Sequence, residues 1–399
     1  MKKIKKIIKK CLPWNLRLAL EKELDKRRQS RYSIPFDWWA EENLFYIEEI
    51  QSSLEKVIAI SNQANLKAFR AEFESKFAQI YKVPAALGVG SGTAALVFSL
   101  LALGVGRGDE VIVPAHTYVS TVLAVLDSGA IPVLVDVKED LTMDPAAVEA
   151  KITPKTKAII PVHIYGYPAD MRSLCQLAGR YHLGIVEDAC QAHATEINGR
   201  LAGSFGDFGC FSFHWSKQVG GPGDGGMLVC RRKKDAMRAV CWREPLGKNF
   251  QVCRSHRTPS RLAPLLIPFL SARLNYLSQD RLKREKLAEE YDAGLKSIKQ
   301  ICLPVRPASK NKHGWRNYTI RVKKREALQK YLNKKGIETK IFYPELLHLR
   351  PELEKFRYKL GDFPVYEAAQ KEILSLPFSQ ALEEKNKMEI IEAIKKFYK

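Results

Sequence analysis

A lone lysine follows an apolar stretch and precedes a glycine-rich loop in the middle of the chain. The stretch is Gly209-Cys-Phe-Ser-Phe-His-Trp-Ser-Lys217, and the loop is Gly220-Gly-Pro-Gly-Asp-Gly-Gly226. A lysine at the end of a buried strand can hold its amine in a pocket, where the loss of water lowers the affinity of the amine for its proton. Such an amine attacks aldehydes and can form a Schiff base with pyridoxal phosphate (PLP). The alternative is a surface lysine beside a loop. The PLP interpretation therefore needs a phosphate site, an acid for the pyridine nitrogen and a group that stacks on the ring.

A second stretch has the composition of an anion site. Residues 85–90 are predicted to form a short strand that enters Ser91-Gly-Thr-Ala-Ala-Leu96, and the run from there to Leu103 is helical. Free backbone N–H groups and the dipole at the start of a helix favour phosphate, and the Thr93 hydroxyl can add a hydrogen bond. The alternative is an ordinary strand-to-helix turn capped by Ser91 or Thr93.

Three further side chains follow predicted strands at their carboxyl ends. The apolar run 184–188 ends in Asp188, and a buried carboxylate is costly unless it meets a cation such as a protonated pyridine nitrogen. Gln191 lies one turn further on and could bond the ring hydroxyl. Tyr118 follows the strand 109–115 and could stack on a flat ring, because ligands of open α/β sheets bind at this edge. The alternatives are a helix N-cap for Asp188 and a buried aromatic for Tyr118.

Strands and helices alternate from residue 85 to residue 230, which predicts a mainly parallel sheet covered on both faces. Apolar runs bounded by turn residues give the strands, which are 85–90, 109–115, 131–136, 157–163 and 184–188. No Gly-x-Gly-x-x-Gly in a nucleotide-binding position and no Walker loop occurs in the sequence.

The C-terminal part of the chain predicts a smaller unit. A long amphipathic helix over 279–297 precedes it, and a βαβ-like unit is predicted from 318–322, 325–335 and 338–343, closed by helices at 366–373 and 383–398.

The composition is that of an ordinary globular protein, apart from its charge. The 399 residues are 46% hydrophobic and 27% charged, enough for roughly two to three domains. No apolar run reaches the ~18 residues of a membrane-spanning helix. The eight cysteines include no Cys-x-x-Cys pair, which favours a reducing compartment. The formal net charge of +21 predicts an anionic partner. Because no nucleic-acid-binding motif is present, we expect a phosphorylated substrate or a membrane surface, no nucleic acid and no metal.

The first residues form a basic amphipathic segment. In residues 1–12 the apolar side chains fall on one helical face and lysines on the other, and Pro13 ends that helix. We predict contact of residues 1–30 with an anionic membrane, and the alternative is a solvated basic tail. Residues 261–274 have an apolar centre flanked by arginines, with two prolines that should interrupt any helix. They are either a second membrane-docking element or part of a dimer interface. The predicted location is the cytoplasm, with peripheral contact at the inner face of the membrane.

Together these motifs resemble one family, the DegT/DnrJ/EryC1/StrS group of PLP-dependent sugar aminotransferases. The similarity runs from about residue 66 to the end, with a weak patch near 245–275. The matching motifs keep the order and spacing of the family; they are 90–96, 108–114, 117–121, 161–166, 186–192, 211–217, 225–226, 341–344, 347–348 and 374–377. The resemblance implies an α/β fold of the aspartate-aminotransferase type (fold type I): a three-layer large domain with a mainly parallel sheet, and a smaller α+β C-terminal domain. It also implies a homodimer.

The resemblance implies roles for single residues. Lys217 would form the Schiff base with PLP and move the proton between the sugar carbon and the cofactor, while Asp188 would pair with the pyridine nitrogen. The remaining implied cofactor contacts go to the ring, through Tyr118 and Gln191, and to the phosphate, through Ser91, Gly92, Thr93 and Ser212. An amino acid, usually glutamate in this family, would load the cofactor. A nucleotide-linked keto sugar would then accept the amine, for surface-polysaccharide or amino-sugar synthesis.

The chain departs from the family pattern at three places. Pro259 falls where the family commonly has an asparagine that reaches the cofactor phosphate of the partner subunit, and Arg316 stands where a histidine is frequent. The glycine loop is one residue longer than usual. These departures leave two alternatives, a different PLP-dependent reaction and a regulatory or membrane-associated relative without turnover. Arg316, Tyr343 and His348 are candidate substrate residues, although the last two could be exposed loop residues without a function.

The sequence therefore divides into three parts. Residues 1–50 form the basic N-terminal arm, residues 51–250 the PLP-binding large domain, and residues 251–399 the divergent interface segment with the small C-terminal domain.

Overall fold

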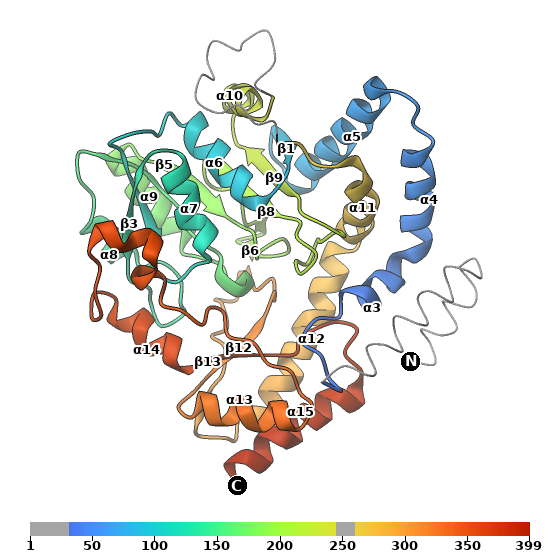
Figure 1. Cartoon of the computed structure of the whole chain (residues 1–399), viewed down its shortest axis with the longest axis vertical. Coiled ribbons are helices and arrows are strands. Elements are labelled where there is room, and N and C mark those ends of the chain that lie inside the picture. Colours follow the sequence, from blue (N-terminus) through green and yellow to red (C-terminus); the bar gives the residue numbers. More distant parts are fainter. Residues whose placement is uncertain (1–31, 245–259) are drawn as a thin grey trace.

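A computed structural model describes residues 32–244 and 260–399 of the chain. Figure 1 shows a large α/β part around a central sheet and a smaller part that contains the C-terminus. The strands of the central sheet come from residues 85–230, and those of the smaller part from residues 301–376. The predicted membrane segment 1–30 and Pro259 lie outside the described residues.

Seven strands form the central sheet. They are β1 (Ala85–Val89), β2 (Glu110–Pro114), β3 (Ile131–Val135), β4 (Thr156–Ile159), β5 (Gly184–Asp188), β8 (Phe208–Ser212) and β9 (Gly226–Cys230). Their order is β1-β9-β8-β5-β4-β2-β3. Only β9 is antiparallel to its neighbours, β1 and β8, so the prediction of a mainly parallel sheet is confirmed. The other six strands all end at the same edge of the sheet.

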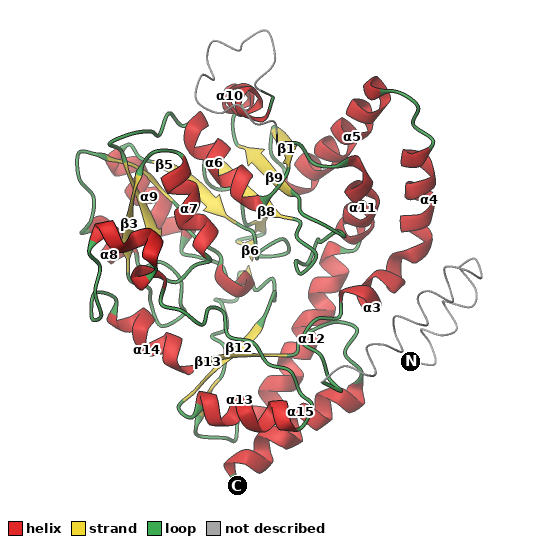
Figure 2. Cartoon of the chain, viewed as in Figure 1, coloured by secondary structure: helices red, strands yellow, loops and turns green. Residues whose placement is uncertain are grey.

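Helices cover both faces of the central sheet, as Figure 2 shows. One layer consists of α6 (Gly92–Ala102), α7 (Val119–Asp127) and α10 (Lys233–Arg243), and the other of α5 (Gln63–Tyr81), α8 (Pro145–Glu149) and α9 (Met171–Tyr181). In β2, Val111 and Val113 belong to the core with α6 and α7, whereas Ile112 belongs to the core with α5 and α9. Because the strand is apolar on both sides, it can be buried on both faces. The three-layer prediction is therefore confirmed.

Two strand predictions for the central sheet differ from the structure. The strand predicted over 157–163 ends at Ile159, because Pro161 has no N–H to donate to a ladder. Beyond it only a single bridge joins Val162 to Asp188. Strand β9 was not predicted, because it follows directly on the glycine-rich loop.

The smaller part contains a three-stranded antiparallel sheet in the order β10-β12-β13, with helices packed on it. Its elements are β10 (Ile301–Cys302), β12 (Tyr318–Val322), β13 (Ile373–Leu376), α12 (Leu277–Leu295), α13 (Arg325–Lys334), α14 (Pro364–Glu372) and α15 (Glu384–Tyr398). The predicted βαβ unit is wrong, because residues 338–343 form no strand and β13 pairs with β12 instead. A single bridge from Lys340 to Ser375 fixes this segment, and beyond it the chain crosses to the edge of the central sheet.

Three short strands form a third sheet beside the central one. They are β6 (Glu196–Ile197), β7 (Arg200–Leu201) and β11 (Asn311–Lys312), in the order β11-β6-β7.

Three further helices lie together at one side of the large part. They are α3 (Trp39–Asn43), α4 (Ile47–Ile58) and α11 (Ile267–Asn275). The expectation that prolines interrupt any helix over 261–274 is wrong, because Pro268 lies in the first turn of α11, where a missing N–H leaves no helical hydrogen bond unmade.

The apolar side chains of segment 261–274 pack into the core of this same chain. The buried ones include Leu262, Leu266, Ile267, Leu270, Ala272 and Leu274. Of the leucines in this segment, Leu265 is exposed. Within the described ranges, no helix combines the length and apolar character needed to cross a membrane.

Candidate active site

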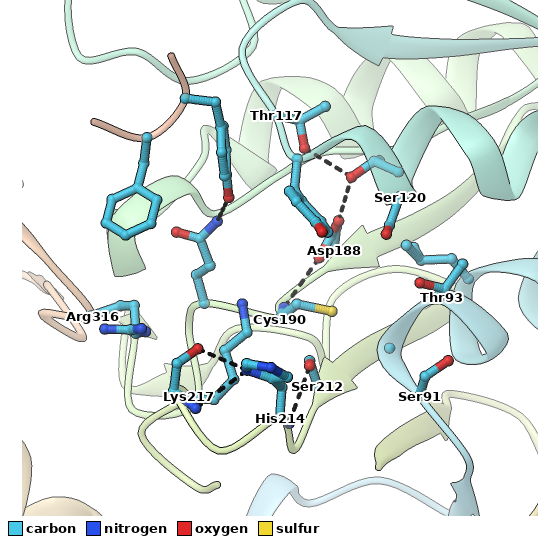
Figure 3. A pocket seen from close by; sticks show the side chains of 18 of the residues that line it. Ser91, Thr93, Thr117, Ser120, Asp188, Cys190, Ser212, His214, Lys217 and Arg316 are labelled. Carbon is cyan, nitrogen blue, oxygen red and sulfur yellow. Dashed lines mark hydrogen bonds between the residues drawn. The ribbon is translucent and has the colours of Figure 1, made fainter. Parts of the chain in front are cut away.

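A cavity of about 430 Å³ opens at the edge where the parallel strands end. The segments that follow β1, β2, β5 and β8 all reach it, as expected for an open α/β sheet. Every residue that the sequence predicted to bind the cofactor lines this cavity, and so do Arg316 and Tyr343. Figure 3 shows how their side chains lie around it.

Lys217 lies in the loop that connects β8 to β9. Its backbone N–H donates to the carbonyl of His214 at 2.8 Å, and its side chain is half-buried at the cavity wall. Burial, together with the nearby Arg316 guanidinium, lowers the pKa of Lys217 from 10.5 to about 8, while Cys190 and Asp188 oppose the change. The lowered pKa makes the unprotonated, nucleophilic form of the amine easier to reach near neutral pH than it is for an exposed lysine.

Asp188 is the last residue of β5, and its carboxylate is buried. Thr121 donates its hydroxyl to Oδ2 at 2.8 Å, and the backbone N–H of Cys190 donates to Oδ1 at 3.1 Å. Across the described ranges no cationic side chain forms an ion pair with Asp188. A buried carboxylate that is held by hydrogen bonds but lacks a counter-ion fits a cationic ligand group at this point.

The start of α6 forms the opposite wall. The Ser91 hydroxyl accepts from the N–H of Ala94 at 3.1 Å, so the capping role that was the alternative for Ser91 is present in the structure. Two glycines let this turn pack closely on the sheet. A Cβ on Gly92 would lie 2.8 Å from the Cys190 sulfur, and a Cβ on Gly226 would lie 2.4 Å from the Ser91 carbonyl oxygen. The helix N-terminus can thus approach a bound anion closely.

Another wall of the cavity is formed by two aromatic residues, Tyr118 and Tyr343, together with Gln191. Tyr118 precedes α7 and is 52% exposed, and its ring centroid lies 5.3 Å from that of Tyr343. The Gln191 amide donates to the Tyr343 hydroxyl at 3.0 Å and accepts from the N–H of Tyr165 at 2.9 Å. The side-chain amide of Gln191 is therefore fixed by two partners.

One candidate substrate residue singled out from the sequence, His348, does not line this cavity. His348 lies in a turn over Leu347–Leu349, is buried against Phe363 and approaches Glu367 at 3.2 Å. It was predicted as a candidate substrate residue at the cleft, with an exposed loop residue as the alternative. The structure places it among apolar neighbours, which explain its burial. Pro259 lies in the range that the structure leaves out.

Sequence reasoning missed several residues that line the cavity. Thr121 was part of a recognised motif, but its bond to Asp188 became evident only once β5 and α7 were adjacent. The available signal was spacing, because Thr117 and Thr121 are one helical turn apart and their hydroxyls lie 2.8 Å from each other. His214 and Asn317 also line the cavity; His214 lies between the selected residues Ser212 and Lys217, and Asn317 directly follows Arg316.

Residues 34–43, which we call the N-terminal strap, lie against the loop that carries Lys217. Glu42 in this strap is buried and accepts from Arg273 at 3.1 Å and from Arg284 at 2.8 Å. Arg273 also donates to the carbonyl of Gln218 at 3.2 Å. The strap is therefore joined through a buried ion cluster to the residue that follows Lys217.

The side chains present fit PLP. The start of α6 suits a phosphate, the amine of Lys217 suits an aldehyde, and the unpaired buried carboxylate of Asp188 suits a protonated ring nitrogen. Lys217 follows β8 and Asp188 ends the neighbouring strand β5 of a mostly parallel sheet. This arrangement of a lysine and an acid is that of PLP-dependent fold type I enzymes.

Comparison with known proteins gives the family. The model of the DegT/DnrJ/EryC1/StrS aminotransferase family matches residues 46–395, and the chain belongs to this family. It is thus a PLP-dependent transaminase with the fold type I architecture, which confirms the predicted family, fold and cofactor.

Three relatives illustrate the similarity. The dTDP-3-amino-3,4,6-trideoxy-alpha-D-glucose transaminase of Streptomyces venezuelae is 39% identical over 326 residues, which cover 82% of this chain and 86% of that protein. The crystal structure of DesV from S. venezuelae is 36% identical, with a TM-score of 0.86 over 92% of this chain and 98% of that one. The structure of NtdA from Bacillus subtilis with bound cofactor PMP is 29% identical, with a TM-score of 0.77 over 88% of this chain and 81% of that one.

Proposed function

We propose that this transaminase moves an amino group from an amino acid, with glutamate as the donor, to a nucleotide-linked keto sugar for surface-polysaccharide or amino-sugar synthesis. The observation that carries the proposal is the shared cavity of Lys217 and Asp188, in which the lysine amine has a lowered pKa and the carboxylate forms no ion pair with any of the described residues. The name of the 39% identical relative, a transaminase that acts in the series of dTDP-linked amino sugars, supports the sugar substrate.

Different residues of the cavity would have different roles in the reaction. PLP, when bound, supplies an electron sink that stabilises negative charge on the substrate carbon. Asp188, fixed by Thr121 and by the N–H of Cys190, keeps the ring nitrogen protonated. Lys217 would move a proton from the donor carbon to the cofactor in the first half-reaction and from the cofactor to the sugar carbon in the second, because its lowered pKa suits both directions of transfer.

Substrate chemistry agrees with the charge of the chain. A nucleoside diphosphate carries negative charge, and a chain with a net charge of +21 attracts such a ligand over long range. The start of α6, with Ser91, Gly92, Thr93 and the facing Ser212, is assigned to the cofactor phosphate, so the nucleotide must bind elsewhere on the cavity rim.

The test is a coupled turnover assay. The purified protein is loaded with PLP and incubated with L-glutamate and a panel of dTDP-, UDP- and GDP-linked keto sugars, and amino sugars are identified by mass spectrometry. We expect one sugar series to be aminated and Lys217→Ala to abolish the product. Absence of the PLP absorbance band from the wild-type protein would instead favour the non-catalytic alternative.

The oligomeric state is a separate proposal, which the family resemblance supports. We propose a homodimer, with the face of α4, α5 and α11 at the interface, because open grooves of about 460 and 510 Å³ lie between these helices. Light scattering after size-exclusion chromatography tests the state, and a monomer at micromolar concentration would contradict it.

Membrane contact is proposed for residues 1–30 alone, at the inner face of the membrane of a cytoplasmic protein. The support is the basic amphipathic pattern of this segment. Segment 261–274 is not included, since its apolar side chains are used within the chain. Co-sedimentation with anionic liposomes should be lost when residues 1–30 are deleted, and unchanged co-sedimentation would refute the proposal.

A further inference from the structure

Arg316 places a cationic guanidinium at the cavity wall. It follows Trp315 in the segment that enters β12, and its backbone N–H donates to the carbonyl of Tyr165 at 2.8 Å. Its guanidinium donates to the amide oxygen of Asn317 at 3.0 Å. Among the residues that the structure describes, no carboxylate forms an ion pair with it. A half-buried guanidinium with most of its donors unused is costly unless a ligand supplies the acceptors.

Two acids that act electrostatically on Arg316 are bonded to other cations. Asp37 and Glu42 of the N-terminal strap both act electrostatically on Arg316. The Asp37 carboxylate is bonded to the amine of Lys340, and Glu42 accepts from Arg284 at 2.8 Å. Since the neighbouring cations already hold these carboxylates, Arg316 is the cation of this cluster that faces the cavity unpaired.

The cavity thus has two places that favour an anion, at opposite ends. In Figure 3, Ser91 and Thr93 lie at one side, Arg316 lies at the other, and Lys217 and Asp188 lie between them. The helix start at Ser91 suits a phosphate, as described above. A guanidinium is planar and presents paired donors, which match a carboxylate in a bidentate arrangement.

We propose that Arg316 forms a carboxylate-binding subsite that orients the amino-acid donor beside Lys217. This inference rests on the proposed transamination and adds to it the group by which the donor is recognised. A carboxylate of an acidic acceptor sugar has the same chemistry, and the experiment below separates the two sources.

The position next to Lys217 gives the subsite a second effect. The positive charge of Arg316 lowers the pKa of Lys217. A carboxylate bound at Arg316 would offset that charge and raise the affinity of the lysine for a proton. The amine would therefore accept a proton from the donor carbon more readily when the donor is in place.

Equilibrium binding tests the subsite without turnover. Isothermal titration calorimetry is performed on the PLP-loaded full chain with glutarate, which has two carboxylates and no amine, and with glutaramide as its uncharged counterpart. The variants are Arg316→Gln, Arg316→Lys and Arg316→His. Arg180→Gln is the matched control, since this arginine lies on α9 and pairs with Glu149 away from the cavity.

We expect Arg316→Gln to weaken glutarate binding about tenfold to a hundredfold, the loss that corresponds to a charge-assisted hydrogen-bond pair. Arg316→Lys should retain part of the affinity because it keeps the charge without the paired donors. Arg180→Gln should leave binding unchanged. Glutaramide affinity should not depend on residue 316. Glutarate affinity that is unchanged in all three variants at position 316 would overturn the subsite.

A second arm identifies the source of the carboxylate. D-glucuronate is titrated in parallel with D-glucose, and the KM for L-glutamate is measured for each active variant. Loss of glucuronate binding with unchanged glutarate binding would overturn the donor assignment in favour of an acidic sugar. If the wild type aminates a sugar and Arg316→Gln keeps its KM and glutarate affinity, the subsite fails and the proposed function stands. If the wild type binds glutarate through Arg316 but aminates no sugar, the proposed function fails and the subsite stands.

Discussion

Replacement of Lys217 by methionine should stabilise the cofactor-free protein, and the gain should depend on pH. Methionine fills a similar volume with an apolar chain and removes the amine. In the folded protein the amine is deprived of water and lies near a second cation, Arg316. The charged form of Lys217 is therefore less stable in the folded state than in the unfolded chain.

The magnitude follows from the pKa of Lys217. It is lowered from 10.5 to about 8, and each unit corresponds to about 1.4 kcal/mol, which gives a cost of roughly 3 kcal/mol. Below pH 8 the lysine is protonated in both states, so the wild type bears the whole cost. Between pH 8 and 10.5 the unfolded state binds more protons, so wild-type stability rises with pH. Above that window the amine is neutral in both states and the cost is absent.

Urea denaturation of both proteins, followed by tryptophan fluorescence at several values from about pH 7 to about pH 10.5, measures this difference. We expect Lys217→Met to exceed the wild type by about 3 kcal/mol at pH 7 and the gap to close across the window. Lys299→Met, at an exposed position, is the control and should show no such trend. A gap of constant size at every pH would refute desolvation of the amine as its origin.

Three more substitutions test the packing and charges of the site. Gly226→Ala should destabilise the protein by about 1–3 kcal/mol and weaken PLP binding in a fluorescence titration, because the new Cβ would lie 2.4 Å from the Ser91 carbonyl oxygen. Asp188→Asn should lower turnover about a hundredfold while PLP is still bound, since an amide cannot neutralise a protonated ring nitrogen; turnover near the wild-type value would contradict the role of this carboxylate. Glu42→Gln should lower the free energy of unfolding by about 3–5 kcal/mol in urea, because two buried guanidiniums lose their shared counter-charge; a loss below about 1 kcal/mol would show that the cluster contributes little.

The residues predicted to hold the cofactor line one cavity, and the sequence could place them together because its signals are local. Each predicted residue follows a strand with an apolar run, and parallel strands end at one edge of a sheet. Asp188 and Ser91 could therefore be placed together without knowledge of any contact between distant residues. Strand β9 was missed because it follows directly on the glycine-rich loop, so no separate turn marks where the strand begins.

The features that were predicted wrongly or missed depend on contacts between residues that are distant in the sequence. Residues 338–343 resemble a strand in composition, but the place beside β12 is taken by β13. Burial of His348 depends on Phe363 and on α14. The cluster around Glu42 joins residues more than two hundred positions apart, which no periodicity or motif can reveal.

The hairpin that carries Lys217 has a consequence for how such a site can diverge. The lysine lies between β8 and β9, which are paired in register from Phe208 with Cys230 to Ser212 with Gly226. Both ends of the loop are fixed by this ladder, so residues can be inserted or lost between them without shifting either strand. A longer glycine segment after Lys217 would then reshape the cavity wall near Asp224, while the amine stays in place. Substrate range can thus evolve through loop length at one connection, independently of the chemistry that the strand ends support.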